Sequence, residues 1–441
     1  MAVQGVERSD NVEQSDREKI DYAKLLSIGS LHMGQYFPMG FGGIALPAIL
    51  RSVGMPLSMM WLLGLPTIPR SFKWLMALVV DNYGSRRIGM RKTWIIPCTL
   101  LGASLYYAIS YLPPTMATIH VIVAILVLKS IIMGAQDIAV DAFAAENMND
   151  ADRATGTSII NFMATIGGFL GGSLMGAYDI LGWRWTMTIA ATLLILAVLP
   201  AVIRKEPPPP PASEMRRKRG ERPSLIKALK RHDSYYIIPF LFAFGFAGTF
   251  MGAMFTLFLV DMGVPLPKIG GILPVAGLIG SGGAAFATPV IVKHLGLRGA
   301  GIVGMCFLPI EGLTFAWLSH SGELPGFFAL TALCSVLFFT TGIYGYAVSI
   351  SRFRWASKAQ AGTDYSLQSS LWNLGVYAGG ATAGFVAEWF EYTVYYLIAA
   401  VIATSIALCY VLMFNHVERL VQVREQVELE DLAPSEEAGA E

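Results

Sequence analysis

The chain has 441 residues, of which 54% are hydrophobic and only 14% are charged, and its formal net charge is +1. A soluble globular protein carries about 25% charged residues. So few charges leave too little polar surface for a water-soluble fold, and the near-neutral balance gives no basic footprint for nucleic acid. We therefore expect an all-α, polytopic membrane protein with no nucleic-acid partner.

Apolar stretches of about 20 residues recur along the whole chain, and this is the length that a helix needs to cross roughly 30 Å of hydrocarbon. They predict twelve transmembrane helices, at residues 25–50, 56–80, 93–112, 119–146, 157–178, 184–203, 235–260, 268–293, 299–319, 326–350, 364–388 and 392–414. The residues before the first span mix both charge signs and hold no apolar core, so we do not expect a cleaved signal peptide.

Lysine and arginine are distributed unevenly between the loops on the two sides of the predicted membrane. One side carries a basic central loop together with Arg86, Arg87, Arg91, Lys92, Arg352, Arg354 and Lys358. The loops of the other side hold little beyond Arg51, Arg184 and Lys268. Because basic loops stay in the cytoplasm, we expect a multi-pass protein of a bacterial-type inner (cytoplasmic) membrane with both termini cytoplasmic.

The longest break in the apolar pattern divides the chain into two halves. It begins at Arg204 and contains a run of five prolines, the basic sequence RRKR and the segment SLIKALKR, which favours a short amphipathic helix. We predict five parts: a cytoplasmic N-terminal segment (1–24), an N-terminal six-helix half (25–203), a cytoplasmic basic linker (204–234), a C-terminal six-helix half (235–414) and a cytoplasmic acidic tail (415–441).

The two halves repeat each other weakly. Gly171 matches Gly379 at a separation of 208 residues, and Gly84 matches Gly296 at a separation of 212. Two parallel six-helix halves, with a site between them at the middle of the membrane, are the architecture of major facilitator transporters. Helices in lipid approach each other closely through small residues, so the glycine-rich faces at 167–176 and 375–384 predict packing surfaces.

Ionisable residues inside the fourth span predict a functional site, because a charge at the middle of a span costs at least about 2.5 kcal/mol. The segment QDIAVDA places Asp137 and Asp141 one turn apart on one helix face, with Gln136 and Lys129 on the neighbouring face. Two carboxylates so close are not both stable as anions, so one should hold a proton more tightly than a free aspartate. Asp137 is therefore a candidate for proton coupling or for substrate binding.

For Asp141 and Lys73 two interpretations stay open. Asp141 lies near the predicted cytoplasmic end, where it either carries the proton or latches the closed state by pairing with a basic neighbour. The candidate neighbours are Arg86, Arg87 and Arg153. Lys73 lies two turns from the end of the second span, where it either snorkels toward water or faces the interior as a cation.

Spans 1 and 9 carry further polar residues. His32, Gln35 and Tyr36 lie among glycines in the first span, where a lone histidine either bonds to a neighbouring helix or relays a proton. Glu311 in the ninth span has no evident local partner, so it is either a second proton site or a group that bonds to a neighbouring helix. We count Gln35, Tyr36 and Glu311 among the candidate pathway residues.

The eleventh span opens with a polar and aromatic face. Gln368 and Trp372 share one side of the predicted helix, with Asp364 and Tyr365 one turn earlier. Such a surface suits an organic solute, whereas a simple inorganic ion does not require it. We therefore count Asp364, Gln368 and Trp372 as candidate substrate contacts.

Motifs for other chemistries are missing from the sequence. It contains no phosphate-binding loop of the GxxxxGKS/T type, no HExxH motif, no selectivity filter and no nucleophile elbow. The four cysteines lie in apolar spans without CxxC pairing or metal-ligand spacing, which predicts packing roles. We expect no cofactor, no metal and no enzymatic activity, with an ion gradient as the energy source.

Together these motifs resemble one branch of the major facilitator superfamily, which includes muropeptide permeases, acetyl-CoA transporters and inner-membrane siderophore permeases. The resemblance is carried in the first half by Ser71, Lys73, Ala77, Asp81, the basic loop from Gly89 to Trp94, and QDIAVDA. In the second half, AGTDYSLQSSL at 361–371 is similar to the start of span 11 in the siderophore permeases.

The resemblance implies that a set of polar residues lines or gates the pathway: Lys73, Gln136, Asp137, Asp141, Asp364 and Gln368. We place the cytoplasmic gate at Asp81, Arg86, Arg87, Asp141 and Arg153. The predicted function is that of a monomeric secondary transporter working by alternating access, in which proton symport drives inward movement of a mid-sized polar organic solute.

A siderophore or metal-chelate is the substrate class that the start of span 11 favours. A muropeptide or an acyl-CoA-type metabolite is the alternative. A multiply phosphorylated solute needs several interior cations, and only Lys73 and Lys129 are evident unless Arg70 or Arg352 also reaches the cavity. An intramembrane enzyme or a receptor is the remaining alternative, with Asp137 and Asp141 as an aspartyl dyad.

Overall fold

The computed structural model describes residues 21–72, 76, 79–80, 83–85, 87–148, 150–204, 225–357 and 361–430. Within these residues the chain forms helices and no strand. This is the expected outcome for a chain in lipid, because a helix satisfies its own backbone hydrogen bonds where no water is available.

In the first half, α2 (Tyr22–Gly40) continues through the π-helix η1 (Phe41–Ala45) into α3 (Leu46–Ser52), and these three elements form the first crossing. The second crossing begins with η2 (Leu57–Thr67) and α4 (Ile68–Ser71). The elements that follow are α6 (Lys92–Ile109), α7 (Ile119–Asn147) and α8 (Asp150–Ile203).

The second half is laid out in the same way. Its elements are α10 (Leu225–Lys230), α11 (Ser234–Ala253), α12 (Phe255–Asp261), α13 (Leu266–Ser321), α14 (Phe327–Trp355) and α15 (Ala361–Glu430). The short helix α10 forms within the segment for which an amphipathic helix was predicted. The last helix extends beyond the predicted twelfth span, so the predicted tail begins as helix.

Three of these elements each make two crossings. A straight helix of the 54 residues of α8 would be about 80 Å long, far more than a bilayer accommodates. A tight turn breaks α8 at Gly182, α13 at Gly296 and α15 at Glu391, each with a φ between 62° and 76° and a ψ between 167° and 175°. The chain folds back on itself at each of the three turns.

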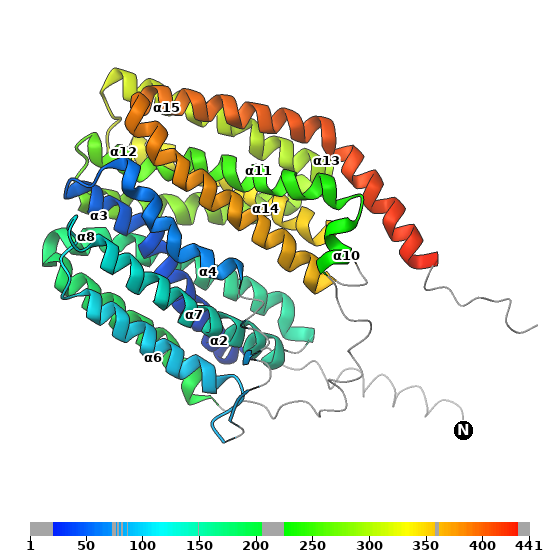
Figure 1. Cartoon of the computed structure of the whole chain (residues 1–441), viewed down its shortest axis with the longest axis horizontal. Coiled ribbons are helices and arrows are strands. Elements are labelled where there is room, and N and C mark those ends of the chain that lie inside the picture. Colours follow the sequence, from blue (N-terminus) through cyan, green and yellow to red (C-terminus); the bar gives the residue numbers. More distant parts are fainter. Residues whose placement is uncertain are drawn as a thin grey trace, which may run out of the picture.

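The crossings add up to the twelve that the sequence predicts. Among the described residues, six helices are long and apolar enough to cross a membrane, and three of them contain one of these turns. The first crossing (22–52), the second (57–71) and α6 complete the set. Figure 1 shows the first half, from blue to teal, beside the second half, from green to orange.

Glycines bring the same pair of helices together in each half, as the repeat predicts. A Cβ atom on Gly167 or Gly171 of α8 would overlap the carbonyl oxygen of Met33 or Phe37 of α2. In the second half, Gly375 and Gly379 of α15 lie against the carbonyl oxygens of Phe242 and Phe246 of α11 in the same way. Such close backbone contact allows dense packing without any polar side chain.

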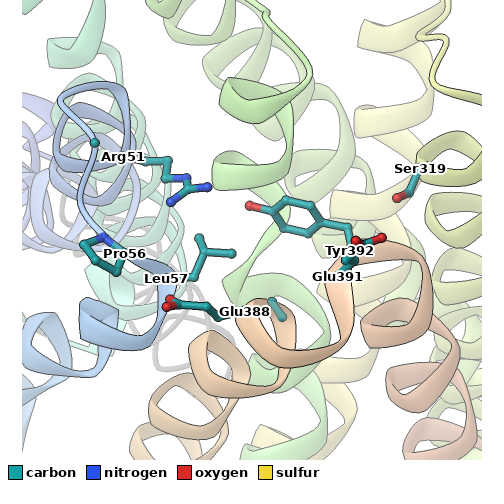
Figure 2. A pocket seen from close by; sticks show the side chains of 9 residues that line it. Arg51, Pro56, Leu57, Ser319, Glu388, Glu391 and Tyr392 are labelled. Atoms are coloured by element: carbon teal, nitrogen blue, oxygen red, sulfur yellow. The ribbon is translucent and has the colours of Figure 1, made fainter.

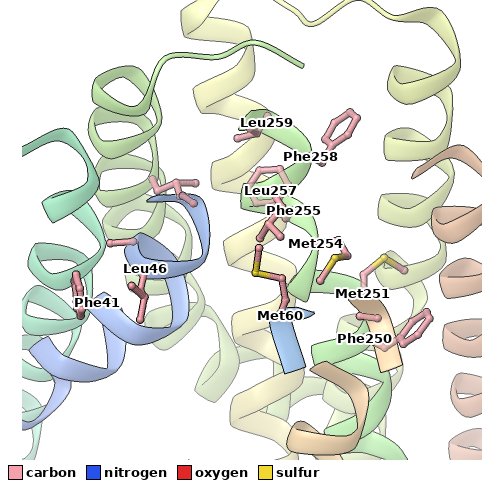
Figure 3. Close-up of a cluster of buried hydrophobic side chains, with 14 of the residues drawn as sticks. Phe41, Leu46, Met60, Phe250, Met251, Met254, Phe255, Leu257, Phe258 and Leu259 are labelled. Atoms are coloured by element: carbon pink, nitrogen blue, oxygen red, sulfur yellow. The ribbon is translucent and has the colours of Figure 1, made fainter. Parts of the chain in front are cut away.

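The halves meet at one end of the molecule, where α3 contacts α12 and both lie far from α10 (Figure 1). One cluster of buried apolar side chains continues from the first half into the second there, and Figure 3 shows Met60 of η2 beside Met254 and Phe255. Gly384 of α15 adjoins the carbonyl oxygen of Leu57. We call this end, formed by residues 51–58, 261–267 and 384–392, the clasp end.

The opposite end, which we call the linker end, carries the beginning of α2, α10, and the end of α14. Asp21 caps α2 there by accepting a hydrogen bond from the Lys24 backbone N–H, and it pairs with Arg204. These two contacts hold the pKa of Asp21 below its ordinary value. Arg424 in the extension of α15 pairs with Asp233 and so joins that extension to the start of α11.

Gly171 and Gly168 offer a matched test of the packing between α2 and α8. Gly171→Ala drives a methyl group into the Phe37 carbonyl oxygen, so we expect it to destabilise the protein by about 1–3 kcal/mol. A Cβ on Gly168 meets no atom within 4 Å, so Gly168→Ala should be neutral or slightly stabilising. Thermal unfolding of the purified variants in detergent measures both, and equal effects would argue against this contact.

The turn at Glu391 predicts a stabilising substitution. Its backbone has a φ of 62° and a ψ of 167°, a combination that is essentially restricted to glycine and costs other residues about 1–3 kcal/mol. Glu391→Gly should therefore raise stability by about 1 kcal/mol after the entropy of the added glycine is subtracted. Gly296→Ala, at the matching turn of α13, should lower the melting temperature. A fall in melting temperature for Glu391→Gly would contradict the assignment of strain.

Candidate functional site

A cavity of about 760 Å³ lies between the two halves and extends toward the linker end. Its volume suits a mid-sized organic molecule. The polar residues of the first half that line it are Gln35, Thr67, Arg70, Lys129, Ser130, Asp137 and Asp141. Those of the second half are Tyr365, Ser366, Ser369, Ser370 and Asn373.

The first crossing opens space for the cavity. Pro38 cannot donate a backbone hydrogen bond, and the π-helix η1 follows it directly, as expected where the regular helical ladder is interrupted. Gly42 and Gly43 of η1 both line the cavity, and a Cβ on either would meet no atom within 4 Å. The irregular helix and its small residues leave the wall hollow at mid-height.

Arg70 and Asp137 form an ion pair in the wall of the first half. The Arg70 Nη2 atom lies 3.6 Å from the Asp137 Oδ2 atom. Arg70 comes from α4 and Asp137 from α7, so the pair joins the second crossing to the fourth. At 3.6 Å the pair is loose enough for a further anion to share the Arg70 guanidinium.

Lys129 is a buried cation that faces the same cavity. Its side chain donates to the Tyr106 hydroxyl at 2.7 Å, and the ammonium group lies 4.1 Å from the centroid of the Tyr106 ring. Only 6% of the residue is exposed, and no carboxylate among the described residues forms an ion pair with it. A hydroxyl and a ring stabilise a buried ammonium less than an anion does, so Lys129 has capacity to bind one.

A second carboxylate of α7 lies at the mouth of the cavity. The Asp141 Oδ1 atom is 3.5 Å from His32 Nε2, and the Asp141 side chain is 53% exposed. Behind the wall, Gln136 accepts a hydrogen bond from Gln35 and donates one to Thr99, both at 3.4 Å. Gln35 lines the cavity, whereas Gln136 is fully buried.

The second half contributes hydroxyl and amide groups from the beginning of α15. Ser366, Ser369, Ser370 and Asn373 line the cavity at the i, i+3, i+4, i+7 spacing of one helix face. Tyr365 adds an aromatic ring to this face. We call these five residues the α15 face; they lie opposite the charged wall of the first half.

The predicted face of span 11 is rotated relative to the α15 face. Asp364 accepts hydrogen bonds from Arg231 at 2.5 Å and from the Ser357 backbone N–H at 2.9 Å, which ties the linker end together. Gln368 is buried, and Trp372 packs against Tyr344. None of Asp364, Gln368 and Trp372 is among the described residues that line the cavity.

The remaining predicted residues lie in several places. Tyr36 is 41% exposed and does not belong to the described cavity lining. Glu311 of α13 is buried inside the second half, where the Thr340 hydroxyl contacts its carboxyl group. Arg87 donates its backbone N–H to the Ser85 hydroxyl. Lys73, Asp81, Arg86 and the Arg153 side chain lie outside the described residues.

The sequence indicated Arg70 only as a further cation that could reach the cavity, and of the α15 face it indicated only Tyr365 as a candidate. The α15 face was detectable, because its polar residues repeat at helical spacing in the printed sequence. Arg70 follows Pro69 in a stretch where the sequence drew attention to Lys73 instead. Its pairing with Asp137 brings together residues that are 67 positions apart, and no local pattern indicates such a contact.

The clasp end closes the opposite side of the cavity. The Arg51 Nε–H donates to Asp261 at 2.7 Å, and the Tyr392 hydroxyl donates to the same carboxylate at 2.6 Å. The Ser58 backbone N–H donates to Glu388 at 2.5 Å. Figure 2 shows Arg51 and Tyr392 pointing toward each other from opposite halves, beside a pocket of about 530 Å³. The Arg51–Asp261 bond and the Ser58–Glu388 bond each connect the first half to the second.

A bundle of two helical halves, closed at one end and with a cavity that extends toward the other, is the architecture of membrane transporters. The family model of the Major Facilitator Superfamily matches residues 28–353. The chain belongs to this superfamily.

Sequence relatives agree with that assignment. A protein of Rickettsia felis named as a transporter, AmpG 4, is 23% identical over 342 residues, covering 73% of this chain and 80% of the relative. An uncharacterized protein of Schizosaccharomyces pombe is 32% identical over 124 residues, covering 27% of this chain and 24% of that protein.

Solved structures show the same fold. The crystal structure of the nucleoside transporter NupG matches with a TM-score of 0.64 at 16% identity, covering 89% of this chain and 99% of that chain. The structure of PepTSo, a transporter of the POT family, matches with a TM-score of 0.69 at 12% identity, covering 91% and 99%. At these identities the likeness concerns the fold alone.

Proposed function

We propose that the protein is a proton-coupled secondary transporter that imports an acidic, hydroxylated organic solute of the muropeptide class. The observation that carries the proposal is the asymmetry of the cavity, with cations in the wall of the first half and hydroxyl and amide groups on the α15 face. A sugar acid linked to a short peptide matches both walls, because its carboxylates suit Arg70 and Lys129 and its hydroxyl and amide groups suit the serines and Asn373.

The competing substrate classes receive less support from this geometry. The similarity to siderophore permeases rests on residues 361–371. Tyr365 and three serines of this stretch line the cavity, whereas its charged residue Asp364 and the amide of Gln368 are not among the described lining residues. An acyl-CoA carries several phosphate charges, whereas the cations among the described lining residues, Arg70 and Lys129, share the cavity with two aspartates. Muropeptides remain as the class in the resembling branch whose charge and size suit the cavity.

Proton coupling follows from the competition for Arg70. While Asp137 is ionised it holds the Arg70 guanidinium, so an incoming carboxylate must displace it. Protonation of Asp137 removes that competitor and frees Arg70 for the substrate. Proton and anionic solute therefore favour each other's binding, which is the thermodynamic requirement for symport.

Alternating access would open one end of the cavity as the other closes. We place the linker end in the cytoplasm of a cell with an inner membrane, since the described basic residues Lys92, Arg204 and Arg354 lie there. The clasp end then faces outward, and its contacts of Arg51 with Asp261 and of Ser58 with Glu388 must break for substrate to enter. The cytoplasmic gate proposed at Asp81, Arg86, Arg87, Asp141 and Arg153 would form in their place. The proposed unit is a monomer.

An aspartyl dyad is not favoured by the arrangement of the two aspartates. A dyad needs two carboxyl groups that share one proton. Asp137 lies beside Arg70, whereas Asp141 lies beside His32, so each has its own basic neighbour. A basic side chain beside each carboxylate is not expected where two carboxyl groups share a proton. Transport therefore remains the function that the geometry supports best.

The experiment that tests the proposal is uptake of radiolabelled muramyl tripeptide into cells that lack their own muropeptide permeases and express this protein. We expect accumulation that a protonophore abolishes. A parallel arm supplies iron-loaded siderophores to cells without siderophore permeases. Accumulation of the siderophore, with no uptake of muramyl tripeptide by protein shown to be in the membrane, would overturn the substrate assignment.

Asp137 and Glu311 were both candidate proton sites, and their positions now predict different outcomes. Asp137→Asn keeps the size of the side chain but cannot release a proton, so concentrative uptake should fall to the protonophore-treated level while counterflow persists. Glu311→Gln should retain most concentrative uptake, because Glu311 is buried inside the second half and is not a described lining residue. The reverse pattern would assign the coupling proton to Glu311.

A further inference from the structure

Arg352 of α14 is a cation held one layer behind the α15 face. Its guanidinium carbon lies 5.6 Å from the centroid of the Tyr365 ring and 5.5 Å from that of Trp372. Its Nη1 group donates to Ser369 at 3.4 Å, and its Nη2 group donates to Ser349 at 2.9 Å. Two of these neighbours, Tyr365 and Ser369, line the cavity.

No anion among the described residues pairs with Arg352. Its Nε atom is buried and has no hydrogen-bond partner within the part of the chain that the structure describes. Arg354, two residues further along α14, provides the contrast, because both Glu425 oxygens accept from its Nη1 group at 2.8 and 2.9 Å. The same helix end thus carries one arginine with a carboxylate partner and one without.

A partly buried guanidinium without an anion is an unfavourable arrangement unless a partner arrives. Removing a cation from water costs free energy that rings and hydroxyls repay only in part. Arg352 is nevertheless well oriented, because aromatic faces and serine hydroxyls restrict the rigid fork of its guanidinium. The bond to Ser369 at 3.4 Å is long, so an anionic oxygen that approaches from the cavity can replace it.

We propose that Arg352 binds a second acidic group of the transported solute. Resting on the function proposed above, this assignment narrows the substrate to a molecule with two acidic groups. One group would bind Arg70 and Lys129 in the first half, and the other would bind Arg352 beside Ser369 in the second half. A solute held in this way bridges the two halves.

The bridge gives the solute a role in the conformational change. A solute bound to one half alone does not favour closure of the linker end over its opening. Contacts with cations of both halves are strongest when the halves approach each other, so a two-acid solute stabilises the closed linker end. A solute with a single acidic group satisfies the first half and leaves Arg352 without an anion.

The anion site can be tested without knowing the substrate. Purified full-length protein in a neutral detergent is titrated with inorganic phosphate at constant ionic strength, and the rise in melting temperature is compared among three proteins: wild type, Arg352→Gln and the control Arg354→Gln. We expect a saturable rise for the wild type and for Arg354→Gln, and a rise reduced by at least half for Arg352→Gln. Equal rises in all three would overturn the proposal.

A lipid headgroup is another source of phosphate. We therefore repeat the titration in micelles that contain phosphatidylglycerol. The assignment to a transported solute predicts that the response to phosphate is unchanged. Loss of that response in the wild type would show that lipid occupies the Arg352 site and would refute the assignment.

Uptake assays then distinguish this inference from the proposed function. Muramyl tripeptide is compared with a derivative whose terminal carboxylate is amidated. The wild type should prefer the unmodified peptide by about tenfold in apparent affinity, as expected for loss of one charge-assisted contact, and Arg352→Gln should not discriminate. If both proteins take up the peptide and discriminate equally against the amidated derivative, the role of Arg352 is refuted but the proposed function is not. No uptake by the wild type, with the phosphate response intact, would refute only the muropeptide assignment.

Discussion

In the mechanism that we propose, the ion pair between Arg70 and Asp137 controls which anions the cavity binds. A charge in a poorly solvated site requires a partner, and here one guanidinium is available to an internal carboxylate or to an anion from outside. We propose that protonation of Asp137 decides between them. The neighbouring Lys129 makes the same wall attractive to anions, while the α15 face offers hydroxyl and amide groups that select for a polar organic body.

The proposed mechanism requires each half to keep its shape, and the close glycine contacts favour this. In each half, backbone lies directly against backbone where the first helix of the half meets the fifth, so the charged wall and the α15 face each keep their shape. In the proposed alternating access, movement occurs where the halves meet. At the clasp end, contacts such as Arg51 with Asp261 join them through polar groups that can exchange with water, which is what a reversible closure needs.

The sequence predicted the fold more fully than the site. Twelve crossings follow from the length of each apolar run, and even the crossings hidden in α8, α13 and α15 are visible as pairs of runs. Asp137 and Asp141 face the cavity together because their spacing is a property of one helix. The rotation of a helix relative to its neighbours depends on the packing of the whole bundle and cannot be derived from spacing within one helix. For this reason Ser369 lines the cavity, whereas Gln368 was expected to do so. Arg70 with Asp137 and Arg51 with Asp261 are contacts between distant segments, which no local spacing encodes.

The central claim is that substrate and proton bind together because they compete for the charge state of one ion pair. It is tested most directly by calorimetric titration of muramyl tripeptide into the purified protein in buffers with different ionisation enthalpies. We predict that binding takes up protons near neutral pH, that the uptake vanishes in Asp137→Asn, and that the variant still binds the peptide. Binding with no proton uptake by the wild type at any pH, or unchanged proton uptake in Asp137→Asn, would contradict the claim.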